Sequence, residues 1–175
     1  VRALTAQVPG AHPVLCGLDS AYLAEDDEDF ITNTGYYYAK LRHLSDLHEA
    51  MKLDKICKIA IYSRSAEPAV YPALKTLEPE FAVALSGSTW VDVMNPNVSK
   101  GAALAVLCAK LGITAEECMV FGDYLNDLSM LRACPNSYAM KNAHPALKSS
   151  AAHITDEDND HDGVLRVLRR EFNLI

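Results

Sequence analysis

The sequence predicts an α/β protein with two parts, and three observations support this prediction. Up to about residue 95, short β-type runs are mixed with segments of helical spacing, which is typical of an α+β domain. Asn95-Pro96-Asn97 then interrupts the pattern, and beyond it strand-like and helix-like segments alternate, as they do in a parallel sheet covered by helices. Half of the 175 residues are hydrophobic, which is enough to fill a core. We therefore expect domains at residues 1–95 and 96–175.

In the first part, the period of the apolar residues separates strands from helices. Strands are expected at residues 13–18, 58–62, 81–86 and 90–94, and helices at residues 41–53 and 68–77. We interpret the acidic residues 25–29 as an exposed turn. Residues 31–40, which contain three consecutive tyrosines, are interpreted as a further β-type run.

In the second part, cap residues mark the first helix: Ser99 precedes it and Gly112 follows it. Strands are expected at residues 118–121, 137–140 and 153–155. Helices are expected at residues 126–134, from Pro145 onward, and at residues 164–172. Strands that alternate with helices in this way form parallel sheets.

Charge and composition restrict the classes of ligand. The net charge of −7 opposes binding to nucleic acid or to an anionic membrane surface. There is no apolar run of about 18 residues and no secretory signal pattern, so we expect a cytoplasmic protein. The five cysteines form no Cys-x-x-Cys pair and are interpreted as small apolar residues without chemistry. They are Cys16, Cys57, Cys108, Cys118 and Cys134.

The main chemical motif is a strand that ends in Gly122-Asp123 and is followed by Asn126-Asp127 at a helix start. Ligands of open α/β sheets bind beyond the carboxyl ends of the strands. Two carboxylates, an amide side chain and backbone N–H groups at a helix start suit Mg²⁺ and phosphate. Lys100, at the start of the preceding helix, adds a positive charge that would pair with phosphate.

Together, the segments Asn97-Val98-Ser99-Lys100-Gly101, Gly122-Asp123-x-x-Asn126-Asp127 and Ala139-Met140-Lys141-Asn142-Ala143 resemble the haloacid dehalogenase superfamily, in its Cof-like subfamily IIB. The resemblance is close from Trp90 to the C-terminus. It implies a Rossmann-like core, of which residues 96–175 are the C-terminal half, and an α+β cap domain at residues 1–95. It also implies a phosphatase that acts on a small phosphorylated metabolite through an aspartyl-phosphate intermediate.

The resemblance assigns roles to individual residues. Lys100 resembles the phosphate-neutralising lysine, Asp123 the Mg²⁺ ligand and Asn126 the residue that contacts the transferred phosphoryl group. Asp127 resembles an additional acidic support for the metal. Asn142 resembles a residue of the outer shell, although Lys141 stands where glycine is commoner. In the cap, Trp90 and Asp92 are candidates for substrate selection, and for Trp90 ordinary packing is the alternative.

The family's nucleophile motif, Asp-x-Asp-Gly-Thr after a strand, does not occur in these 175 residues. The chain also begins with Val1 and not with methionine. We therefore expect that the chain starts inside the cap of a longer protein, that it is inactive alone, and that it forms a homodimer or associates with the missing segment. Hydrolysis through an aspartyl-phosphate requires the attacking carboxylate.

Three other interpretations fit parts of the sequence. The chain could be a non-catalytic binding module on a degenerate phosphatase scaffold. It could be a flavodoxin-like or receiver-like domain, although the α+β first half argues against this. Residues 158–163 match the opening of a calcium loop, but Arg169 occupies the position that requires glutamate, so a helix-capping turn is favoured.

Overall fold

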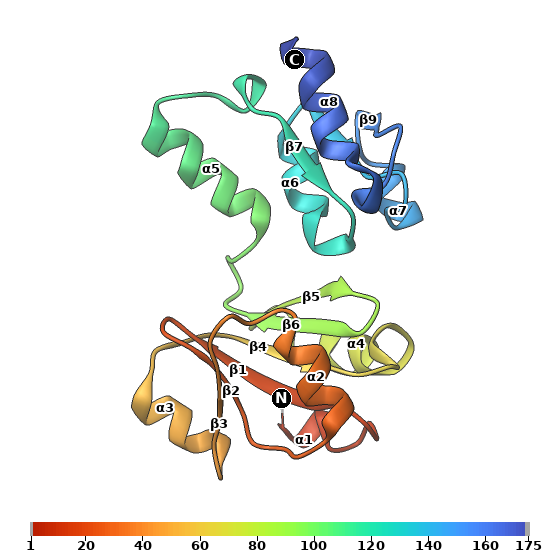
Figure 1. The fold of residues 1–175 in the computed structure, drawn as a ribbon. Helices are drawn as coiled ribbons and strands as arrows, with labels where there is room; N and C mark the ends of the chain where they lie inside the picture. The colour runs from red at the N-terminus through yellow and green to blue at the C-terminus, as the bar shows by residue number, and fades with distance from the viewer. Residues whose placement is uncertain (1, 174–175) are drawn as a thin grey trace. The chain divides into compact units, whose positions relative to one another are not determined.

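The structure is a computed structural model that describes residues 2–173, and its contacts divide the chain into two compact units, one ending at Pro96 and the other beginning at Asn97 (Figure 1). The sequence places the boundary one residue earlier. Each unit has its own sheet and its own hydrophobic core.

The first unit is built on a six-stranded sheet with the strand order β3-β2-β1-β4-β6-β5. The strands are β1 (His12–Gly17), β2 (Ala21–Leu23), β3 (Leu41–His43), β4 (Ile56–Tyr62), β5 (Ala82–Gly87) and β6 (Trp90–Met94). Only β2 and β3 pair in parallel, and all other neighbours are antiparallel. The four strands that the apolar pattern predicts in this unit are confirmed.

Side chains that alternate along the strands form a separate core on each face of this sheet. On one face, α2 (Glu28–Gly35) covers Val14 and Tyr62 with Phe30. On the other face, η2 (Ala66–Val70) and α4 (Tyr71–Lys75) cover the sheet with Val70 and Leu74. The short helices α1 (Arg2–Thr5), η1 (Leu47–Glu49) and α3 (Ala50–Leu53) complete the unit.

Two expectations for the first unit are wrong. Residues 28–35 are helical, because Asp27 caps the helix by accepting a hydrogen bond from the Phe30 N–H at 2.8 Å, and Glu28 and Asp29 favour its first turn. The tyrosines therefore follow a helix and do not alternate across a sheet. Residues 41–43 form β3, because pairing with β2 outweighs the helical spacing, and only residues 47–53 are helical.

Asp54 fixes the turn between β1 and β2. Its carboxylate accepts hydrogen bonds from the backbone N–H groups of Leu18, Asp19 and Ser20 at 3.0–3.2 Å. It also accepts one from the Tyr22 hydroxyl at 3.1 Å. Desolvation acts to raise the pKa of Asp54, but these hydrogen bonds outweigh it and lower the pKa below its usual value.

We expect the stability of the first unit to depend on this carboxylate in acid. A depressed folded-state pKa stabilises the fold above the unfolded-state value of about 3.9, and this contribution is lost as the pH falls through the folded-state pKa. Urea unfolding followed by the fluorescence of Trp90, the only tryptophan, should show a midpoint that falls below about pH 4. Asp54→Asn should flatten that dependence, whereas Asp19→Asn, at an exposed neighbour, should keep it. Equal profiles for the two variants would contradict this role.

The second unit is a three-stranded parallel sheet in the order β7-β8-β9. The strands are β7 (Val120–Gly122), β8 (Ser137–Ala139) and β9 (His153–Ile154). The helices are α5 (Lys100–Leu111), η3 (Ala115–Glu117), η4 (Leu125–Asp127), α6 (Leu128–Ala133), α7 (Pro145–Lys148), η5 (Asn159–His161) and α8 (Gly163–Phe172). The predicted parallel alternation is confirmed.

The predicted caps of α5 are also confirmed. The Ser99 side chain accepts a hydrogen bond from the Ala102 N–H at 3.1 Å. Gly112 ends the helix with a φ of 68°, in the left-handed region that glycine adopts without a steric penalty. The core of this unit includes Val120, Leu131 and Leu147. No helix within residues 2–173 combines the length and apolar character that a membrane crossing requires.

Candidate functional site

The candidate site is the loop that follows β7, at the carboxyl end of the parallel sheet. The Met140 N–H donates to the Gly122 carbonyl, and the His144 N–H donates to the Asp123 carbonyl, each at 2.9 Å. The loop after β8 therefore lies against the loop after β7. Because the carboxyl ends of parallel strands meet at one edge, polar groups from two loops collect there.

The side chain of Asp127 holds this loop in place through hydrogen bonds to its backbone. Asp127 is only 3% exposed. Its Oδ2 accepts hydrogen bonds from the N–H groups of Asp123 at 2.9 Å and Tyr124 at 3.3 Å, and its Oδ1 forms an ion pair with Lys100 Nζ. Both carboxylate oxygens thus have donors from the protein itself. Asp127 connects the start of α5 to the loop that carries Asp123.

Two glycines, Gly122 and Gly101, make this arrangement possible because a larger residue at either position would clash with its neighbour. A Cβ on Gly122 would lie 2.6 Å from the Asp127 Cβ, and a Cβ on Gly101 would lie 2.6 Å from the Ser129 carbonyl oxygen. The Gly101 N–H also donates to Ser129 Oγ at 3.0 Å, so the first turn of α5 packs against the start of α6. The two glycines allow Lys100 and Asp127 to approach each other.

Asp123 and Asn126 are the groups that remain open to a ligand. The Asp123 side chain is exposed and Asn126 is half-buried. Within residues 2–173, neither side chain has a hydrogen bond or an ion pair to another protein group. A solvent-facing carboxylate oxygen at the end of a strand is a suitable ligand for a hard cation such as Mg²⁺. Among residues 2–173, no three His, Cys, Asp or Glu side chains lie close enough together to hold a metal ion, so Asp123 offers one metal ligand and not a complete site.

Asn142 and Lys141 lie at the edge of this site. Asn142 Nδ2 donates to Asn159 Oδ1, and Lys141 Nζ forms an ion pair with Glu157 Oε2 at 3.1 Å. Both side chains connect the loop after β8 to the loop after β9. In these contacts, Asn142 supports the neighbouring loop and does not touch Asp123.

The acidic turn at residues 158–162 leads into α8. Asp158 accepts hydrogen bonds from the Asp160 N–H at 3.1 Å and from His161 Nδ1 at 2.6 Å, and the Gly163 N–H donates to its carbonyl at 2.9 Å. His161 lowers the pKa of Asp158, and Asp158 raises the pKa of His161. The Asp158 side chain caps η5, in accordance with the helix-capping interpretation.

In the first unit, Asp92 forms an ion pair that the sequence pattern does not reveal. Asp92 is 6% exposed, and Lys58 Nζ donates to both of its carboxylate oxygens at 3.0 Å. Lys58 lies 34 residues away in sequence but on the adjacent strand β4. Nearby on the same face, Cys16 Sγ and the Tyr38 hydroxyl are 3.3 Å apart, and burial and Cys16 raise the pKa of Tyr38.

Trp90 lies in an aromatic cluster at the start of β6. Its ring centroid is 5.3 Å from that of Tyr62, 5.6 Å from that of Tyr37 and 6.3 Å from that of Tyr38. The residue is 6% exposed, and Nε1 has no hydrogen-bond acceptor among the described residues. These contacts are those of a packed core residue.

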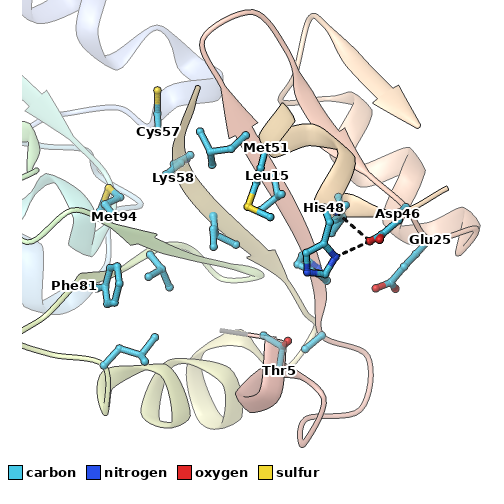
Figure 2. A pocket seen from close by; sticks show the side chains of 18 of the residues that line it. Thr5, Leu15, Glu25, Asp46, His48, Met51, Cys57, Lys58, Phe81 and Met94 are labelled. Carbon is cyan, nitrogen blue, oxygen red and sulfur yellow. Dashed lines mark hydrogen bonds and ion pairs between the residues drawn. The ribbon is translucent and has the colours of Figure 1, made fainter. Parts of the chain in front are cut away.

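A groove of about 750 Å³ lies on the opposite face of the first sheet (Figure 2). Leu15 and Met51 contribute apolar side chains to it, as Figure 2 shows, and the His48 ring nitrogen Nδ1 lies 2.8 Å from Asp46 Oδ1. None of the residues predicted for catalysis, metal binding or substrate selection lines this groove. Lys58, which pairs with Asp92, is among the residues that line the groove.

The fold is that of an α/β protein in which the polar loop after β7 lies at the carboxyl end of a parallel sheet. The chain belongs to the family of haloacid dehalogenase-like hydrolases, which matches residues 4–168. Its fold is similar to that of the HAD subclass IIB sugar phosphatase BT4131, with a TM-score of 0.78 and 21% identity, covering 99% of this chain and 65% of that one.

Two curated relatives are longer than the segment that this chain matches. It is 32% identical to the HMP-PP phosphatase of Cronobacter sakazakii over 138 residues, which are 78% of this chain and 50% of the relative. It is 31% identical to the 5-amino-6-(5-phospho-D-ribitylamino)uracil phosphatase YbjI of Escherichia coli over 163 residues, which are 91% of this chain and 59% of the relative. The chain thus spans between half and three fifths of these two proteins.

Proposed function

We propose that this chain supplies the metal- and phosphate-holding side of a Mg²⁺-dependent phosphatase that acts on a small phosphorylated metabolite in the cytoplasm. The observation that carries the proposal is the loop after β7, where buried Asp127 holds both the Asp123 backbone and the Lys100 ammonium. The two curated relatives, both phosphatases of small phosphorylated compounds by name, support the reaction class.

In this proposal, Asp123 is the metal ligand and Asn126 contacts the transferred phosphoryl group. When bound, Mg²⁺ would offset negative charge on the phosphate oxygens. Lys100 directs one of its three N–H donors to Asp127 and keeps others for a phosphate oxygen. Asp127 contributes to the metal site indirectly, because its oxygens hold the loop and the lysine. Asn142 supports the adjoining loop.

The attacking carboxylate is a separate requirement. A phosphoryl group is transferred to an aspartate only if that carboxylate lies in line with the leaving oxygen. The Asp-x-Asp-Gly-Thr motif that would supply it is absent from these 175 residues. We therefore propose that the aspartyl-phosphate forms on a residue outside this sequence, in the longer protein.

The isolated 175-residue chain is accordingly expected to release no phosphate above background from an aryl phosphate in the presence of Mg²⁺. The longest protein encoded by the same reading frame should release it, and chelation of the metal should stop the release. Phosphate release from both proteins in parallel checks this. If the isolated chain releases phosphate and Asp123→Ala abolishes that release, the proposal that the attacking carboxylate lies outside this sequence is contradicted. Inactivity of the long protein on a broad panel of phosphate esters would instead favour a binding module.

We further propose that Asp92, with Lys58, contributes to the choice of substrate. An ion pair with a carboxylate that is only 6% exposed is costly to maintain, which motivates a role for Asp92 beyond packing. In the long protein, Asp92→Asn should change the ratio of kcat/KM between two phosphate esters at least about tenfold, the equivalent of 1.4 kcal/mol. Asp26→Asn, at an exposed carboxylate, is the control. A uniform loss on all substrates would indicate a structural role. Trp90 is the second candidate, and packing accounts for its contacts.

A further inference from the structure

Two cysteines of the second unit that are ten residues apart in sequence lie in contact. Cys108 is in the last turn of α5, and Cys118 is in the segment that leads into β7; their sulfur atoms are 3.5 Å apart. Both are free thiols. We propose that Cys108 and Cys118 are a redox pair that closes reversibly to an intrachain disulfide on exchange with a low-molecular-weight disulfide such as oxidised glutathione. The spacing in the sequence gave no sign of this pair.

The backbone holds the two thiols in position before any bond forms. The Cys108 carbonyl accepts hydrogen bonds from Gly112 and Ile113 at the end of α5, the second at 3.1 Å. The Cys118 N–H donates to the Ala115 carbonyl at 3.2 Å. A disulfide bond is about 2.05 Å long, so the sulfur atoms must approach by about 1.5 Å. We expect rotation of the two side chains to supply most of this approach.

Exposure assigns the order of reaction. Cys118 is half-buried, whereas Cys108 is 7% exposed, so the external disulfide reaches Cys118 first. The Cys118 thiolate attacks one sulfur of the oxidant, forms a mixed disulfide and releases one thiolate. The Cys108 thiolate then attacks the Cys118 sulfur, forms the internal disulfide and releases the second thiolate. The two protons lost by the protein are taken up by the two leaving thiolates, so the protein is oxidised by two electrons and the oxidant is reduced.

The protonation state of Cys118 predicts how fast this exchange runs. The hydrogen bond with Cys108 and burial raise the pKa of the Cys118 thiol. Since the thiolate is the attacking species, the first step should accelerate as the pH rises through neutral toward alkaline values.

Two other cysteines provide internal comparisons. Cys134 is 2% exposed, and its Sγ donates to the carbonyls of Ala115 at 3.4 Å and Cys118 at 3.3 Å. The Cys118 Sγ also donates to a carbonyl, that of Thr114 at 3.4 Å, but Cys118 is half-buried and in contact with the Cys108 thiol. Cys57 is exposed on β4 of the first unit. We expect Cys57 to form only a mixed disulfide with glutathione and Cys134 to stay reduced.

The pair lies at the far ends of the two elements that lead to the candidate site. α5 begins with Lys100 and carries Cys108 near its end, and β7 follows Cys118 and ends just before Asp123. A disulfide would join these elements covalently behind the loop. It would also restrict the unfolded chain, so the unfolding midpoint of the second unit should rise on oxidation.

The test uses the Cys57→Ser variant, which has four cysteines, in a buffer of oxidised glutathione. Remaining thiols are alkylated after denaturation, and the intact mass and peptide map are measured. We expect a product lighter by two hydrogen atoms, two alkylated thiols and a Cys108–Cys118 link, all reversed by dithiothreitol. An added Cys134→Ser should leave the link intact, whereas an added Cys108→Ser should yield a glutathione adduct at Cys118.

Oxidation in urea distinguishes a folded pair from chance pairing. The same buffer should give at least a tenfold lower yield of the Cys108–Cys118 link in the unfolded chain. The proposal is overturned if all four thiols stay free, if Cys118 pairs with Cys134, if glutathione adducts persist while Cys108 is present, or if urea leaves the yield unchanged.

Discussion

Replacing Asp123 with asparagine is expected to lower the metal-dependent phosphatase activity that we propose for the long protein at least about a thousandfold. Asparagine keeps the shape of the side chain and removes the charge that would hold Mg²⁺. Charge stabilisation by a bound metal is worth several kcal/mol in the transition state, and about 4 kcal/mol corresponds to a factor of about a thousand in rate. Steady-state phosphate release at several Mg²⁺ concentrations measures this loss.

Asp156→Asn is the matched control for Asp123→Asn. Asp156 is an exposed aspartate of the same unit, and it forms an ion pair with Arg170 at 3.0 Å, away from the loop after β7. Its replacement should leave kcat/KM within about twofold of the wild type, as expected for a surface pair. Activity of Asp123→Asn within tenfold of the wild type, with unchanged dependence on Mg²⁺, would contradict the assignment of the metal ligand.

Replacing Asp127 with alanine is expected to destabilise the second unit by about 3 kcal/mol. The change leaves the N–H groups of Asp123 and Tyr124 without their acceptor. Hydrogen bonds to a charged group are worth about 1.5–3 kcal/mol, and unsatisfied groups add to the cost. Lys100 is half exposed, with a side-chain exposure of 49%, so water compensates most of its loss and the ion pair itself adds little.

Amide hydrogen exchange of β7 and β8 measures this effect, because the only tryptophan lies in the first unit. Protection of the β7 and β8 amides should fall by about a hundredfold in Asp127→Ala, which corresponds to about 3 kcal/mol. The fluorescence transition of Trp90 serves as an internal reference for the first unit. Asp156→Ala should change protection by less than about threefold. Wild-type protection in Asp127→Ala would mean that its hydrogen bonds do not organise the loop.

The features that could be predicted from the sequence are local ones. Ser99 begins α5 because its side chain accepts a backbone hydrogen bond, and Gly112 ends it because glycine adopts the left-handed backbone conformation without a steric penalty. The alternation of strands and helices after Asn97 indicates the parallel sheet, because parallel neighbouring strands are joined by helices. The helix at residues 28–35 escaped prediction because its signal is the cap at Asp27 in an acidic run, which looks like a solvated turn.

Features that depend on contacts between distant residues could not be read from spacing. β3 forms at residues 41–43 because β2 pairs with it, although the apolar residues there recur at a helical period. The register of β4 with β6 brings Lys58 to Asp92 across 34 residues. At the candidate site, the motif named both Asp123 and Asp127, but only the three-dimensional packing shows that Asp127 is buried and paired while Asp123 faces solvent.

The central claim is that the Asp123 loop holds a divalent cation, and paramagnetic Mn²⁺ tests it most directly because it shares the oxygen ligands of Mg²⁺. In NMR spectra of the 175-residue chain, Mn²⁺ should broaden the backbone amide signals of residues 122–127 first, and Asp123→Asn should abolish this effect. Broadening that begins at the acidic turn of residues 158–162, or that persists at residues 122–127 in Asp123→Asn, would contradict the claim.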